Sequence, residues 1–201
     1  MGIVKISQGN SKLGAIPSVS LPAVITCRKC DCHKKCYASR LERLRPSVKK
    51  AYMTNLEILR SDPETYWREV EAAIMMSRFF RFHVSGDIID ERYFKNIVSV
   101  AVRQRHCEIL CFTKQYDFVN KFISESCGSL PENLHIIFSV WVSLDIVNPY
   151  LFPEAHVIYR DGSTTARSDA EVCGGNCTEC AVTDRGCWAL KSGEQVVFVE
   201  H

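Results

Sequence analysis

Short apolar runs alternate along the chain with stretches in which apolar residues recur every three or four positions. The latter spacing, seen for Tyr52, Leu56 and Leu59, predicts amphipathic helices. Strands alternating with helices predict a parallel sheet with right-handed crossovers. The six predicted strands are Pro22–Thr26, Phe79–Ser85, Glu108–Thr113, Leu134–Val140, Ala155–Tyr159 and Gln195–Glu200.

Aspartates mark the expected helix starts. Asp62 precedes a proline, a pairing typical of a cap and the first helical turn. Asp90 precedes a stretch whose apolar residues, including Phe94 and Ile97, fall on one face. A shorter helix is expected after Asp117.

Polar residues alternate with apolar ones in several predicted strands. Arg81, His83 and Ser85 do so in the second strand, and the next three strands also carry polar residues on one face. An open doubly wound sheet should be apolar on both faces, whereas a repeated polar face suits a lumen that holds a ligand or solvent. Local hydrogen bonding of these groups is the alternative. The sequence predicts one α/β domain over residues 1–201, a six-stranded, mostly parallel partial (β/α) barrel with two Cys-rich loops.

The composition is that of a soluble globular protein, with 201 residues, 46% hydrophobic and 24% charged, and a net charge of +2. No run approaches the length of a membrane span and no secretory signal is recognised, so we expect a cytoplasmic protein without a membrane partner. A nucleic-acid partner is not favoured by this charge. A local basic group could form such a site or simply be a solvated helix face; it comprises Arg40, Arg43, Arg45, Lys49 and Lys50.

Eleven cysteines are present, and eight of them fall in the loops 27–36 and 173–187. In a reducing compartment such grouping indicates metal thiolates rather than disulfides. Both loops should emerge at the same end of the barrel, which leaves one metal site or two open. The other three, Cys107, Cys111 and Cys127, are expected to be buried as small hydrophobic residues. The predicted metal ligands are Cys27, Cys30, Cys32 and Cys36 in the first loop and Cys173, Cys177, Cys180 and Cys187 in the second.

Two metals fit these spacings. Cys27-x2-Cys30 and Cys177-x2-Cys180 could together form a four-thiolate zinc site. The spacing Cys173-x3-Cys177-x2-Cys180 instead suits three irons of a 4Fe-4S cluster, with Cys187 available as the fourth ligand. Thiolate ligands alone do not choose between the two.

Several segments resemble the phage-associated gene product 88 family. These are CHKKCYA, AYMTNLEILRSD, FRFHVSGDIIDERYF and CFTKQYD, followed by a closing Cys-rich segment. The resemblance covers about residues 25–190. It implies a phage association and little about activity.

A more distant resemblance is to the radical S-adenosylmethionine enzymes. Those are partial barrels with an iron–sulfur cluster in the loop after the first strand and a Gly-Gly-Glu-type motif after the second. Here Ser85-Gly86-Asp87 stands at the matching place, and the resemblance implies that Asp87 accepts from the cofactor's ammonium group. The first loop departs from the pattern, because Cys32-x3-Cys36 is not followed by a third cysteine.

Residues at the carboxyl ends of barrel strands commonly form the active face. We therefore predict His83 and Lys114 as catalytic residues, although a core histidine and an exposed lysine are the plainer alternatives. Two functions compete: an iron–sulfur enzyme acting on an unknown substrate, and a zinc-stabilised module of a phage or mobile element that binds nucleic acid or protein. The predicted cofactor-binding residues are Ser85, Gly86, Asp87, Thr113 and Ser139.

Overall fold

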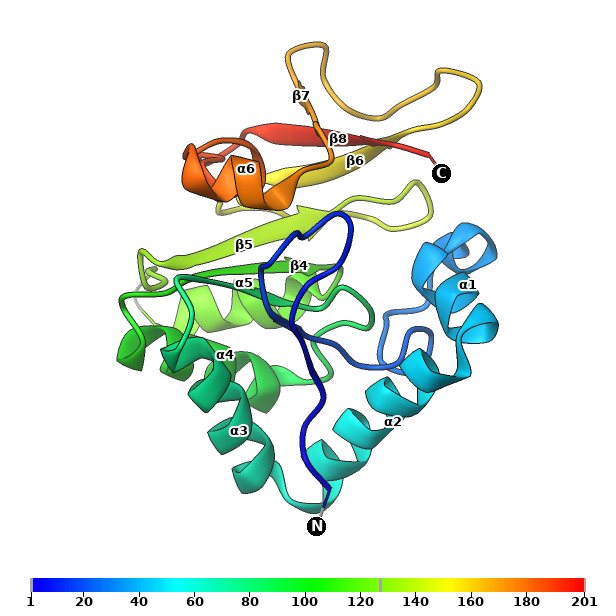
Figure 1. Ribbon diagram of the computed structural model, residues 1–201. Helices are drawn as coiled ribbons and strands as arrows, with labels where there is room; N and C mark the ends of the chain where they lie inside the picture. The colour runs from blue at the N-terminus through cyan, green and yellow to red at the C-terminus, as the bar shows by residue number, and fades with distance from the viewer. Residues whose placement is uncertain (1, 127, 201) are drawn as a thin grey trace.

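The computed structural model describes residues 2–126 and 128–200, which form a single mixed sheet with six α-helices (Figure 1). The strand order is β1-β2-β3-β4-β5-β6-β8-β7, and every neighbouring pair is parallel except β1 with β2. The strands are β1 (Ile6–Ser7), β2 (Ser18–Val19), β3 (Phe79–Phe82), β4 (Glu108–Thr113), β5 (Leu134–Ser139), β6 (Glu154–Ile158), β7 (Glu171–Val172) and β8 (Gln195–Val199).

Six parallel strands, β2 to β6 and then β8, lie side by side in chain order. Right-handed crossovers between such strands put their helices on one face of the sheet, and Figure 1 shows α2–α5 together on one side. The helices are α1 (Tyr37–Leu44), α2 (Pro46–Ser61), α3 (Pro63–Met75), α4 (Glu91–Arg103), α5 (Tyr116–Glu125) and α6 (Cys177–Val182), with 3₁₀ helices η1 (Asp31–Lys35) and η2 (Gly186–Trp188).

The predicted α/β class and the mostly parallel sheet are confirmed, but the strand count is wrong. The sheet of the described residues has eight strands and is open, because its two edge strands, β1 and β7, do not pair with each other to close a barrel. The first predicted strand, Pro22–Thr26, is a turn: Thr26 bonds back to the Pro22 carbonyl and Val24 has a φ of 67°. The strand that opens the parallel series is β2, a few residues earlier.

The predicted helix caps are confirmed at two aspartates. The Asp62 carboxylate accepts from the Thr65 amide at 3.0 Å and opens α3. The Asp90 carboxylate accepts from the Tyr93 amide at 2.7 Å and opens α4. Each satisfies an amide that the first helical turn leaves unpaired.

Both faces of the sheet are packed. On the helix face, Ile109 and Cys111 of β4 join the larger core beneath the helices. On the opposite face, called here the cysteine face, Leu110 and Ile137 pack with the segment that contains the second Cys-rich loop. The predicted polar lumen is therefore wrong, because apolar side chains and half-buried cysteines fill this face.

Candidate metal centre

The first Cys-rich loop lies across the carboxyl ends of the parallel strands. Arg28 forms an ion pair with Asp117, just beyond β4, with 3.1 Å between Nη1 and Oδ2. The Asp31 amide donates to Ser143 Oγ, beyond β5, at 3.0 Å. Lys35 Nζ lies 2.8 Å from Glu200 Oε1, directly after β8. The loop therefore caps the edge at which the carboxyl ends of the strands gather, called here the carboxyl edge.

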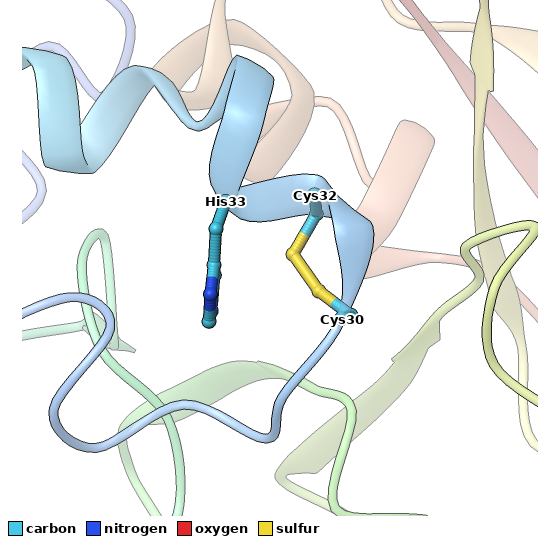
Figure 2. Close-up of side chains that lie close together, drawn as sticks. All are labelled: Cys30, Cys32 and His33. Carbon is cyan, nitrogen blue, oxygen red and sulfur yellow. A yellow bond between two sulfur atoms is a disulfide. The ribbon is translucent and has the colours of Figure 1, made fainter.

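Cys30, Cys32 and His33 form a compact group in this loop (Figure 2). Their candidate ligand atoms all lie within 4.8 Å of one another. His33 Nε2 is buried and has no hydrogen-bond partner among the described residues. Two sulfurs and an imidazole are ligands that zinc and related transition metals prefer, so this group could hold one metal ion.

Cys30 and Cys32 are joined by a disulfide in the structure, with their Cα atoms 5.3 Å apart (Figure 2). The sequence predicted metal-bound thiolates at both positions and not a disulfide. Because the thiolate is the metal ligand, this pair can bind an ion only after reduction and loss of both protons.

Cys27 and Cys36 are free cysteines at the two ends of the loop. Burial raises the pKa of the Cys27 thiol to about 11, and the negative charge of Asp87 acts in the same direction. Lys114 opposes this rise, so Cys27 lies close enough to both residues to sense their charges. The Cys36 sulfur accepts from the Ser39 amide at 3.4 Å and caps α1.

Asp87 organises the carboxyl edge from a buried position. Its carboxylate accepts from the Thr113 hydroxyl at 2.6 Å, the Lys114 amide at 2.9 Å and its neighbour Ile88 at 2.8 Å. Burial raises the pKa of Asp87. These bonds tie the end of β3 to the end of β4, which gives Asp87 and Thr113 a structural role in this edge.

Gly86 has a positive φ of 81° and no room for a side chain. A Cβ there would lie 2.7 Å from the Leu21 carbonyl oxygen and 2.7 Å from Thr26 Oγ1. The sequence predicted Gly86 as a cofactor-binding residue, where the absence of a side chain would let a ligand approach the backbone. In the structure the nearest groups are instead those of residues 21–26, the segment that leads into the first loop.

The remaining strand-end serines also have partners within the protein. The Ser85 hydroxyl is buried and donates to Glu42 Oε1 at 2.8 Å. The Ser139 carbonyl accepts from the Tyr116 hydroxyl at 2.6 Å.

His83 lies in the core on the helix face. Its positive φ of 61° ends β3 and breaks the alternation on which the sequence prediction depended. Its Nε2 lies 3.0 Å from the Tyr93 hydroxyl, and the two rings stack with centroids 5.5 Å apart. Burial lowers the pKa of His83 to about 3, so the ring is neutral at pH 7. The predicted orientation toward a lumen is wrong, whereas Lys114, half-buried beside Cys27, does stand at the carboxyl edge.

The second set of cysteines lies on the cysteine face. All four are free and half-buried, and they pack against its apolar core. The Cys173 amide donates to the Val197 carbonyl of β8, and the Cys177 amide donates to the Lys12 carbonyl, both at 2.9 Å. These bonds fix the start of α6 over the sheet.

Arg81 of β3 is a cation whose charge acts on the thiols of the second set. Burial raises the pKa of Cys187 to about 12, followed by the charge of Cys173, and Arg81 opposes the rise. Burial also raises the pKa of Cys177, against the charge of Arg81 and a hydrogen bond from it. The guanidinium carbon lies 4.8 Å from the Phe112 ring centroid, and Nε is buried without a partner among the described residues.

The two sets occupy different parts of the molecule. Trp188, next to Cys187, contacts the rings of Phe79 and His135, at the amino-terminal ends of β3 and β5, with centroids 5.3 and 6.1 Å apart. The first loop lies at the opposite, carboxyl edge. The expectation that both loops emerge at one end is therefore wrong. The zinc site combining the two loops is not formed, since the described residues give one close ligand group, in the first loop.

Sequence reasoning missed two residues of these sites. His33 stands between Cys32 and Cys36, and a histidine inside a cysteine cluster is itself a metal-ligand signal. Arg81 was noted only as one of several polar strand residues. Its position beside the second set depends on α6 folding across the sheet, which no local pattern predicts.

The structure also bears on the three remaining cysteines, on membrane spans and on the basic group. Cys107 and Cys111 are buried, as predicted, and Cys127 lies outside the described residues. Among the described residues, no helix has the length and apolar character needed to cross a membrane. The five residues of the basic group are all exposed on and between α1 and α2.

Comparison with known proteins gave one family match. The model of the family described as gene product 88 matches residues 4–151. The matched region contains the first loop and the carboxyl edge, and it ends before the second set of cysteines. It is thus shorter at the carboxyl end than the resemblance seen in the sequence. Neither the curated proteins nor the solved structures gave a match.

Proposed function

We propose that this chain, which belongs to the gene product 88 family, is an iron–sulfur enzyme. Its cluster is held by Cys173, Cys177, Cys180 and Cys187, and its substrate binds at the carboxyl edge. The observation that carries the proposal is the gathering of four free, half-buried cysteines on one face of the sheet around a half-buried arginine, Arg81.

The spread of these sulfurs favours a cluster over a single ion. Four thiolates on one zinc, each at about 2.3 Å, lie roughly 3.8 Å from one another. Among the described residues, the second set forms no ligand group within 4.8 Å. A 4Fe-4S cluster suits a wider set, because each cysteine binds a different iron.

The charges around the set support the same assignment. A cluster with four thiolates carries net negative charge, which neighbouring cations stabilise where the site is partly withdrawn from water. Arg81 and Lys12 both act on the Cys177 and Cys187 thiols in the direction that favours the thiolate. The apolar core that includes Leu110 and Ile137 keeps water from this side. A bound cluster of this kind supplies one-electron transfer, and nearby donors and exposure set its potential.

The test is the iron and acid-labile sulfide content of protein produced without oxygen. We expect about four irons and four sulfides per chain, with the visible absorption of a thiolate cluster. The variant Cys177→Ser/Cys180→Ser should lose both elements. Cys107→Ala, which alters a buried thiol in the other core, is the matched control and should keep them. Protein that contains zinc but no sulfide would contradict the proposal.

A second candidate function is a zinc-stabilised module, carried by the first loop. The close grouping of Cys30, Cys32 and His33 favours a single ion there. The variant Cys30→Ser/Cys32→Ser should lose one zinc while keeping iron and sulfide. In the wild type, zinc uptake should require prior reduction of the disulfide by a phosphine. Unchanged zinc content in this variant would remove this candidate.

A further inference from the structure

A cavity of about 590 Å³ opens beside the first loop. Its walls come from the loop itself, from α1, and from the residues that follow β6 and β8. His33 and Cys36 are part of its lining, so the cavity adjoins the candidate metal group. Pockets that bind small molecules usually measure about 300–1,000 Å³. The cavity therefore has room for a ligand of nucleotide size.

The charge of the cavity wall is positive. Four cations line it, Lys35, Arg40, Arg43 and Arg160, against two carboxylates. Both carboxylates already have partners. Glu200 pairs with Lys35 at 2.8 Å and accepts from the Arg160 amide at 3.1 Å. Asp161 accepts from the hydroxyl and the amide of Ser163, at 2.6 and 2.9 Å.

Arg40 and Arg43 are lining cations without an ion-pair partner among the described residues. They stand three positions apart on α1, which puts both guanidinium groups on one side of the helix. Paired guanidinium groups suit phosphate, since each presents a planar fork of donors.

We propose that this cavity binds a small phosphate-bearing ligand of nucleotide size. Arg40 and Arg43 hold its phosphate groups, and the half-buried ring of Tyr159 receives its planar ring system. Tyr159 is held for this contact by Trp141, whose ring meets it edge-on with centroids 5.8 Å apart. This inference names a ligand class for the carboxyl edge and requires no metal in either cysteine set.

A nucleic acid would use a wider surface. The exposed cations continue from α1 onto α2 as Arg45, Lys49 and Lys50, outside the cavity lining. A polyanion would contact these residues as well, whereas a ligand inside the cavity would not reach them. Removing two cations from each place therefore separates the two kinds of partner.

The experiment is calorimetric titration of the full chain with ATP, adenosine and a single-stranded oligonucleotide. We expect one ATP per chain, binding of adenosine at least tenfold weaker, and a loss of tenfold or more in ATP affinity in Arg40→Ala/Arg43→Ala. Lys49→Ala/Lys50→Ala is the matched control and should stay within twofold.

Three results would overturn the inference: no ATP binding at millimolar concentration, equal affinity for ATP and adenosine, or equal losses in the two double variants. Tighter binding of the oligonucleotide, weakened alike by both double variants, would identify a nucleic-acid surface instead. Iron and sulfide are measured in the same samples. Failure of the cluster and failure of the phosphate site are thus read separately.

Discussion

Replacement of Gly86 with alanine tests the packing of residues 21–26, which lead into the first loop, against the segment that follows β3. Gly86 and Gly162 have nearly equal φ values, 81° and 83°. A residue with a Cβ in this left-handed region loses about 1–2 kcal/mol. Around Gly162 nothing lies within 4 Å, so Gly162→Ala incurs this backbone term alone.

Gly86→Ala adds a steric term. The new Cβ would lie 2.7 Å from the Leu21 carbonyl oxygen, 2.7 Å from Thr26 Oγ1 and 2.8 Å from Leu21 Cβ. Thr26 Oγ1 cannot retreat easily, because it donates to the Pro22 carbonyl at 2.8 Å and accepts from the Asp87 amide at 3.3 Å. Overpacking of this kind costs about 1–3 kcal/mol. The total loss should be about 2–5 kcal/mol for Gly86→Ala.

Urea denaturation, followed by circular dichroism at equal protein concentration, measures both variants. We expect Gly86→Ala to lose about 1–3 kcal/mol more than Gly162→Ala, with unchanged denaturant slopes. If the two losses agree within about 0.5 kcal/mol, the close packing at Gly86 is refuted. A fully stable Gly86→Ala that loses ligand binding would restore the ligand-contact interpretation of this glycine.

Three further predictions concern ionisable groups, one in the core and two at the second set of cysteines. Because the pKa of His83 falls from 6.5 to about 3 on folding, the unfolded chain takes up the proton first. Stability should therefore fall by up to about 1.4 kcal/mol per pH unit below pH 6.5, and His83→Gln should reduce this slope in urea titrations while the exposed His106→Gln does not. Arg81→Met removes a positive charge beside the second set, so the reduction potential of the cluster should fall by roughly 60 mV in a redox titration. An unchanged potential would show that Arg81 has no electrostatic effect on the cluster. Burial raises the thiol pKa of Cys187 to about 12, so loading of the second set at pH 7 should release about one proton per cysteine to a weakly buffered indicator, and loading without proton release would show that the thiols are already ionised.

The sequence predicted those elements that a local pattern determines. Glu108–Thr113 has the same bounds as β4, since an apolar run between polar ends defines a buried strand. Asp62 and Asp90 are caps because a short side-chain oxygen can reach the amides of the first turn. The two-residue strands β1 and β7 carry no such pattern. The positive φ at Val24 is the reason that the predicted first strand is a turn. The positive φ at His83 is the reason that this side chain lies on the other face of the sheet from the one predicted.

The cysteine sites show the same limit. Their grouping is local, so the eight candidate ligands could be listed from spacing. The separation of the two sets in space depends on the tertiary fold. β7 adds to the sheet beyond β8, and the chain then carries α6 back over the cysteine face toward Arg81. No local pattern near residues 173–187 predicts that Arg81 lies beside these cysteines.

Mössbauer spectroscopy of protein produced without oxygen in isotopically enriched iron tests the central claim most directly. The account predicts the signal of a 4Fe-4S cluster with all-sulfur coordination in the wild type and its loss in Cys177→Ser/Cys180→Ser. A wild-type spectrum containing only adventitious, oxygen-ligated iron would contradict it.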